Sequence, residues 1–299
     1  MTEVEMSNPV QITPSASIAS DTTIGAVSLT VSDLARSRDF YERVIGLRSF
    51  DLPNGAVSVG VTQDDPMVEL FGDSTAPPLN RRAPGLFHMA ILLPSRLDLA
   101  FALLRLADAH WPLDGASDHL VSEALYLSDP DGIGIEIYRD KPRDEWIRTD
   151  GQLQMPTEPL DLEGLIGEIS GAGESQPRAP TGTSMGHVHL QVSSLRETEG
   201  FYHGVLGFDV TVRSYPGAIF FSAGGYHHHI GANVWHSAGS APASPGAIGL
   251  RSFEIVLPGA DQHSLVLDRV RAADIEISDH DSGRLIRDPS GNGVSLRTA

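Results

Sequence analysis

The sequence predicts an α+β fold made of four βαβββ modules, and two internal repeats support this prediction. The phrase Val-Ser-Asp-Leu-Ala-Arg-Ser-Arg-Asp-Phe-Tyr-Glu-Arg-Val-Ile-Gly-Leu, at residues 31–47, recurs in altered form at 192–208 with the shared residues in the same relative positions. A turn of the form Asp-Pro-x-Gly occurs at 129–132 and again at 288–291. Repetition of this kind indicates similar units that bury their apolar faces against one another.

The first module illustrates the pattern. Residues 24–31 alternate as a strand does, Ser32-Asp33 can cap a helix, and Gly46 can end that helix. A run ending in Leu-Pro opens the second module at 90–94 and the fourth module at 254–258. The four modules are predicted to span residues 24–75, 86–140, 185–236 and 249–297.

Two domains follow from the repeat. The predicted organisation is an N-terminal arm at 1–22, a first domain of modules one and two at 23–140, a connecting segment at 141–183, and a second domain of modules three and four at 184–299. The connecting segment contains several prolines and glycines and a short helical pattern, and it is too long for a tight turn. The segment is therefore long enough for module three to pack at a distance from the end of module two.

Composition excludes several classes of function. The net charge of -18, without basic runs, argues against binding of nucleic acid. No apolar run approaches the ~20 residues of a membrane span, and the polar, acidic start is unlike a signal peptide. We therefore expect a cytoplasmic protein that acts on small molecules. The absence of cysteine excludes disulfides and thiolate ligands, so any metal must be held by His, Asp or Glu, which suits Fe(II), Mn(II) or Zn(II).

One carboxylate needs an explanation. Glu136 lies among isoleucines in a predicted strand that follows the Asp-Pro-Asp-Gly turn. An acid at such a position is costly to bury unless a cation pairs with it, and a metal ion is one such partner. The same stretch contains His119, in a Ser-Asp-His loop, and Tyr126, in the preceding strand. By itself, His119 is equally consistent with a turn residue. Tyr126 is by default a core aromatic, and only its spacing to Glu136 argues otherwise.

Alignment of the four modules brings further candidates into register. The aligned first-strand positions are Ala26, His88, His187 and Ser252, and the last-strand positions are Glu69, Glu136, one of the histidines at 227–229, and Ser295. The histidine run itself is expected to lie in a strand. Modules two and three together offer two imidazoles and one carboxylate, a set that leaves open positions on a non-haem Fe(II). Modules one and four offer only Glu69, and Leu285 stands where module two has Tyr126, so we expect one site.

His189 competes with His187 for the ligand role, because residues two apart on a strand share a face. The alignment of the modules, rather than chemistry, favours His187. Trp146 and Trp235 are candidates for a pocket wall, although core packing is the simpler explanation for both.

These motifs resemble the vicinal oxygen chelate superfamily, which contains glyoxalases, bleomycin-resistance proteins and extradiol dioxygenases, and in particular its two-domain catechol 2,3-dioxygenase type. The resemblance implies two glyoxalase-like domains with cupped mixed β-sheets. It implies Fe(II), or Mn(II) or Zn(II), held by His88, His187 and Glu136. His119 would then be an acid/base, Tyr126 a hydrogen-bond donor, and His228 the imidazole on the dioxygen side. The implied partners are an aromatic diol and O2, with a homodimer as the candidate assembly.

The sequence departs from the familiar extradiol pattern in one respect. Those enzymes take all three ligands from their third and fourth modules, whereas this chain has them in the second and third. Either modules two and three pair across the connecting segment, or the residues of the first half are relics of an inactive site. The full set of His88, His119, Tyr126 and Glu136 in module two, with the spacing of the family, favours the first. Two other functions stay open: a glyoxalase-like isomerase or lyase, and a metal-free protein that binds a small molecule.

Overall fold

The computed structural model describes residues 16–149, 152–170, 177–280 and 283–299. The predicted N-terminal arm therefore lies largely outside the described residues. Its last part is packed rather than loose: Ile18 is buried, and its backbone N–H donates to the carbonyl of Gly207 at 2.8 Å.

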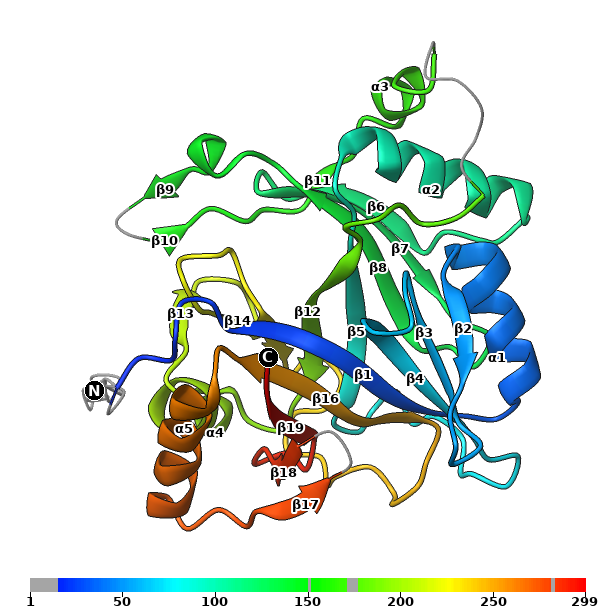
Figure 1. The fold of residues 1–299 in the computed structure, drawn as a ribbon. Coiled ribbons are helices and arrows are strands. Elements are labelled where there is room, and N and C mark those ends of the chain that lie inside the picture. The colour runs from blue at the N-terminus through cyan, green and yellow to red at the C-terminus, as the bar shows by residue number, and fades with distance from the viewer. Residues whose placement is uncertain (1–15, 150–151, 171–176, 281–282) are drawn as a thin grey trace, which may run out of the picture.

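Two large mixed sheets form most of the molecule, beside a two-stranded sheet in the connecting segment (Figure 1). The first sheet has the order β17-β18-β19-β16-β1-β4-β3-β2 and contains the strands of modules one and four. Its strands are β1 (Thr23–Val31), β2 (Arg48–Asp51), β3 (Val57–Gly60), β4 (Pro66–Gly72), β16 (Gly249–Leu257), β17 (Ser278–His280), β18 (Gly283–Arg287) and β19 (Gly293–Thr298).

The second sheet has the order β11-β6-β7-β8-β5-β12-β15-β14-β13 and contains the strands of modules two and three. Its strands are β5 (Gly85–Leu92), β6 (Gly115–Asp118), β7 (Ser122–Ser128), β8 (Gly134–Asp140), β11 (Glu158–Pro159), β12 (Ser184–Gln191), β13 (Asp209–Val212), β14 (Ala218–Ser222) and β15 (Ile230–Asn233). The predicted α+β class and the order βαβββ of each module are thus observed.

The two sheets do not follow the two halves of the chain. Antiparallel pairing of β5 with β12 joins module two to module three, and antiparallel pairing of β1 with β16 joins module one to module four. Each sheet therefore combines one module from each half. Of the two arrangements open from the sequence, this is the one in which modules two and three pair across the connecting segment.

Most of the helices pack on the outer faces of the sheets (Figure 1). The helices are α1 (Leu34–Phe40) with the π-helical turn η1 (Tyr41–Ile45), α2 (Arg96–Asp108), α3 (Leu162–Gly167), α4 (Leu195–Glu199) with the π-helical turn η3 (Gly200–Val205), and α5 (Ala260–Ala272). Helix α3 lies against α2 instead. As predicted, Asp33 caps α1 by accepting from the N–H of Arg36, and Gly46 ends η1 in the left-handed conformation at φ 89°.

The connecting segment is more than a spacer. It contains the 3-10 turn η2 (Arg143–Glu145) and the short strands β9 (Arg148–Thr149) and β10 (Gln152–Leu153), and its strand β11 pairs with β6. It thereby extends the edge of the second sheet beside the Ser-Asp-His loop.

One continuous apolar core lies between the two sheets and beneath the helices. Val27 and Leu29 from β1 belong to the same buried cluster as Met89 from β5 and Val188 from β12. Burial of this kind stabilises the folded state by about 25 cal/mol for each Å² of apolar surface removed from water. The packing of the two sheets therefore fixes the positions of the strands that carry the polar side chains. Among the described residues, no helix combines the length and apolarity needed to cross a membrane.

Candidate active site

Three ligand-type side chains meet on the inner face of the second sheet. Glu136 Oε2 on β8 lies 3.0 Å from His88 Nε2 on β5, and it accepts a hydrogen bond from His187 Nε2 on β12 at 3.2 Å. The parallel register of β5 and β8 sets Glu136 opposite Ala90, two residues beyond His88 on the same face. Among the described residues, this is the one group of three or more His, Asp or Glu close enough to hold an ion.

The spacing of these atoms fits a metal ion. Ligands at neighbouring corners of an octahedron, each about 2.1 Å from the ion, lie roughly 3 Å apart. The two distances to Glu136 Oε2 match that value. His88 Nε2 is buried and has no hydrogen-bond partner in the described part of the chain. Buried polar atoms normally have a partner, and a metal ion could be the partner of this nitrogen.

Charge points the same way. Burial lowers the pKa of His187 to about 4, so its imidazole is neutral at pH 7. Burial alone would raise the pKa of Glu136, but its interactions with His187 and His88 outweigh burial and hold that pKa well below its usual value. A carboxylate is therefore enclosed beside the neutral imidazole of His187, and a bound cation would compensate its charge.

His119 and Tyr126 form a hydrogen-bonded pair beside this cluster. Tyr126 on β7 lies directly across from Glu136 on β8, and burial raises its pKa well above the usual value, so the phenol keeps its proton. His119 Nδ1 donates to the carbonyl of Pro156 at 2.8 Å. In a neutral ring Nε2 then lacks a proton and accepts from the Tyr126 hydroxyl, also at 2.8 Å. The connecting segment thus sets the tautomer of His119.

The three consecutive histidines have three different surroundings. His228 lines the pocket, and its ring lies 4.1 Å from that of His187 between centroids. His227 is turned to Asp140, and His229 Nδ1 accepts from the N–H of Ala223. The expectation of a strand for this run is wrong, because the histidines lie in a bend that ends where β15 begins.

The strand register also corrects the alignment of module three. The residue of β15 that stands opposite His189, as Glu136 stands opposite Ala90, is Gly231. The His227–His229 run therefore precedes the position aligned with Glu136. A side chain at Gly231 would meet the ring of His189 at 3.0 Å, so the small residue leaves room for that imidazole.

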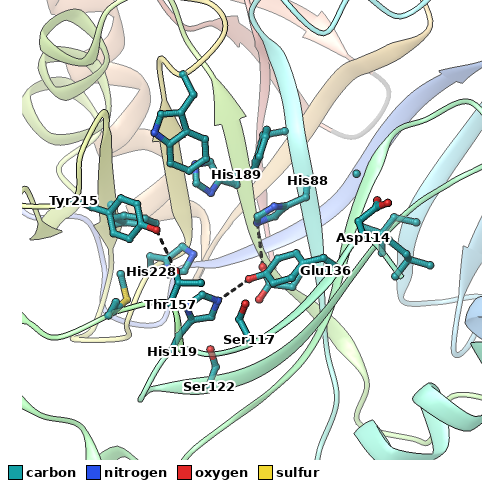
Figure 2. Close-up of a pocket in the computed structure, with 18 of the residues that line it drawn as sticks. His88, Asp114, Ser117, His119, Ser122, Glu136, Thr157, His189, Tyr215 and His228 are labelled. Carbon is teal, nitrogen blue, oxygen red and sulfur yellow. Dashed lines mark hydrogen bonds and ion pairs between the residues drawn. The ribbon is translucent and has the colours of Figure 1, made fainter. Parts of the chain in front are cut away.

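The pocket has a volume of about 500 Å³ and opens above the cluster (Figure 2). Its polar residues include His119, His189 and His228, which Figure 2 shows around the ion pair of His88 with Glu136. Sequence reasoning missed most of its apolar wall, which is formed by Phe87, Val121, Met155, Tyr215, Phe220 and Trp235. Trp235 is the one of the two candidate tryptophans that lines it, whereas Trp146 packs on Tyr226 and His227.

The corresponding face of the first sheet has a different chemistry. Glu69 accepts from the hydroxyl of Ser28 at 2.7 Å, and Glu254 pairs with Arg297 at 2.8 Å, so both acids have local partners. A cavity of about 440 Å³ lies there with Ser252 and Leu285 in its wall, where the second sheet has His88 and Tyr126. The single site expected from the sequence agrees with this asymmetry.

Comparisons with known proteins agree with the geometry. A family model described as the Glyoxalase/Bleomycin resistance protein/Dioxygenase superfamily matches residues 23–137 and 184–296. A catechol-2,3-dioxygenase of Bacillus subtilis (strain 168) is 42% identical over 277 residues, which cover 91% of this chain and 96% of that protein.

Two solved structures show the same fold. A Bacillus subtilis protein provisionally described as a dioxygenase has a TM-score of 0.61 at 15% identity and covers 95% of this chain and 86% of its own. Glyoxalase I from Zea mays has a TM-score of 0.56 at 14% identity, with 92% of each chain covered.

Proposed function

Because the chain belongs to the glyoxalase/bleomycin resistance protein/dioxygenase superfamily, we propose that it is an Fe(II)-dependent extradiol dioxygenase that opens the ring of a catechol-like diol with O2. The 42% identity to a protein named catechol-2,3-dioxygenase, over nearly the whole of both chains, supports this reaction above others of the superfamily. Both oxygen atoms of O2 would enter the product, a ring-opened semialdehyde that carries a carboxylate.

The approach of His88, His187 and Glu136 to one point carries the proposal. Two imidazoles and one carboxylate suit Fe(II) and leave coordination positions open. When bound, iron would supply those positions, together with redox chemistry, to a diol and to O2. Mn(II) would suit the same donor atoms, and Zn(II) would bind them but offer no redox step.

His119 and Tyr126 are the groups that would manage protons on the diol. In its tautomer, His119 Nε2 is the nitrogen without a proton. The Tyr126 hydroxyl lies between that nitrogen and the cluster of His88, His187 and Glu136. A diol oxygen entering the pocket would take the Tyr126 hydrogen bond, and His119 would accept a proton from the ring hydroxyl. Such positioned proton transfer typically contributes about 10²–10⁴-fold to rate.

The remaining pocket residues would bind and shield the ring. Phe87, Phe220 and Trp235 offer apolar surface for a planar aromatic molecule, and His228 would stand on the O2 side. Thr157 from the connecting segment shares a hydrogen bond with the Tyr215 hydroxyl at 3.1 Å, which links the two sides of the pocket (Figure 2).

The test is anaerobic reconstitution with Fe(II), followed by O2 uptake and product spectra on a panel of catechols, beside a Glu136→Ala variant. We expect one O2 consumed for each diol, a yellow semialdehyde product, and neither with the variant. Ring cleavage that survives in Glu136→Ala would remove this residue from the mechanism. Stoichiometric iron without O2 uptake would favour an isomerase or lyase, and no metal at all would favour a binding protein.

A further inference from the structure

A chain of hydrogen bonds runs from the edge of the second sheet to the pocket. Asp140 Oδ1 lies 2.9 Å from Nε2 of His227, and Nδ1 of His227 lies 2.8 Å from Nδ1 of His228. The His227 side chain is fully buried, whereas that of Asp140 is 27% exposed. The proposed chemistry so far uses His228 and leaves the other two residues without a role.

The chemistry of the end groups fixes the direction of the chain. A carboxylate can only accept, so Nε2 of His227 must carry the proton that it donates to Asp140. Nδ1 of a neutral His227 then has a free lone pair, and it can only accept from Nδ1–H of His228. A neutral His228 protonated at Nδ1 has a bare Nε2, which is the nitrogen left for a molecule in the pocket.

Several contacts hold this arrangement in place. Asp140 also accepts from the Tyr226 hydroxyl at 3.2 Å, and that hydroxyl is 2.7 Å from the hydroxyl of Tyr138. The ring of Tyr138 packs 4.9 Å from that of His187, and the ring of Trp146 packs 5.5 Å from that of His227.

Strand β8 joins this network to the cluster of His88, His187 and Glu136. Because residues two apart share a face of a strand, β8 presents Glu136, Tyr138 and Asp140 to one side. The strand that carries the ligand-type carboxylate thus also carries the carboxylate that orients the histidine pair.

We propose that Asp140 and His227 are positioning residues that hold His228 in the Nδ1–H tautomer, with Nε2 as a hydrogen-bond acceptor facing the pocket. The pocket partner of His228 is then a group that carries a hydrogen, such as a hydroxyl of a bound diol. The catalytic meaning of this assignment rests on the proposed dioxygenase function, but the tautomer itself does not.

The direct test uses the metal-free protein labelled with 15N at histidine. Two-bond and three-bond 1H–15N correlations distinguish Nδ1–H from Nε2–H rings, and variants at each histidine assign the signals. We expect the Nδ1–H pattern for His228 and the Nε2–H pattern for His227. In Asp140→Asn, the amide can donate as well as accept, so both rings should lose their single tautomer. Asp144→Asn, on the exposed turn η2, is the matched control and should leave both patterns unchanged.

A second measurement separates positioning from folding. Iron-loaded Asp140→Asn should keep the metal content and the circular dichroism spectrum of the parent while kcat for ring cleavage falls about 10- to 100-fold. The proposal is overturned if His228 has the Nε2–H pattern in the parent protein, or if both rings keep their single tautomers in Asp140→Ala, which removes the acceptor. Because the spectra need no iron, a failure of ring cleavage would leave the tautomer result standing, and a wrong tautomer would leave the dioxygenase proposal standing.

Discussion

His187 Nε2 lies 3.2 Å from Oε2 of Glu136, although the two residues come from opposite halves of the chain. Pairing of β5 with β12 brings them together, since His187 stands opposite Ala90 and Ala90 stands opposite Glu136. The cluster of His88, His187 and Glu136 therefore depends on the contact between modules two and three.

Substitution of His187 by alanine should abolish stoichiometric metal binding. The variant loses one of three donors and leaves Glu136 with a single imidazole, so we expect the affinity for Fe(II) or a substitute ion to fall by about 100-fold or more. Metal content after dialysis and competition with a chromogenic chelator measure the change. His189→Ala is the matched control, because His189 lies on the same face but outside the three-atom cluster. Equal loss of metal in both variants would contradict the choice of His187.

Tyr126→Phe should slow ring cleavage without affecting the metal. The phenyl ring keeps its packing, whereas the hydroxyl that bonds His119 is lost, so kcat should fall about 10- to 100-fold at unchanged metal content. Steady-state kinetics with a catechol, together with metal analysis, check this. Tyr215→Phe removes a hydroxyl from the far side of the pocket and should change kcat much less. Similar losses in both variants would show that Tyr126 has no special part.

Much of this molecule was readable from the sequence because its modules repeat. The repeat predicts the strand and helix order of all four modules, and the alignment of the modules selects His88, His187 and Glu136, which the structure brings together. The partner of each module was not fixed, because all four have similar apolar faces and short-range pattern does not distinguish between them. That choice depends on packing over the whole chain.

The wall of the pocket was beyond sequence reasoning for a different reason. Met155 and Thr157 lie in the connecting segment, where no periodicity marks a buried face, and they reach the pocket only because β11 pairs with β6. The alternation of apolar and polar residues around the histidine run predicts a strand there. The bend arises from specific hydrogen bonds, such as that from Ala223 to His229, which pattern alone does not reveal.

Gly186→Ala should destabilise the fold next to the cluster. A Cβ at this position would overlap the Tyr138 hydroxyl and lie 2.7 Å from its Cζ, and Tyr138 is fully buried. Overpacking of this kind costs roughly 1–3 kcal/mol, and the displacement should also weaken metal binding by His187. Urea unfolding and metal titration provide the measurements.

Two further variants make the Gly186 experiment specific. Gly167→Ala, where nothing lies within 4 Å of the added carbon, should be neutral or slightly stabilising. In Gly186→Ala combined with Tyr138→Phe, removal of the hydroxyl should recover part of the lost stability. A double variant as unstable as the sum of the single variants would mean that Tyr138 is not the obstacle.

Asp129, in the first Asp-Pro-x-Gly turn, should make stability depend on pH. Burial raises its pKa to about 6, although its Oδ1 accepts from the N–H groups of Asp131 and Ile133. The folded state therefore prefers the neutral acid, so this contribution is complete below the unfolded pKa of about 3.9 and is lost as pH rises through 6. A shift of about two units corresponds to roughly 3 kcal/mol.

Asn at this position keeps the acceptor oxygen without the charge, so between pH 4.5 and 7.5 metal-free Asp129→Asn should gain stability relative to the parent in urea unfolding. Asp39→Asn, at an exposed acid, should follow the parent, and a parallel profile for Asp129→Asn would show that Asp129 titrates as freely as it does in the unfolded chain.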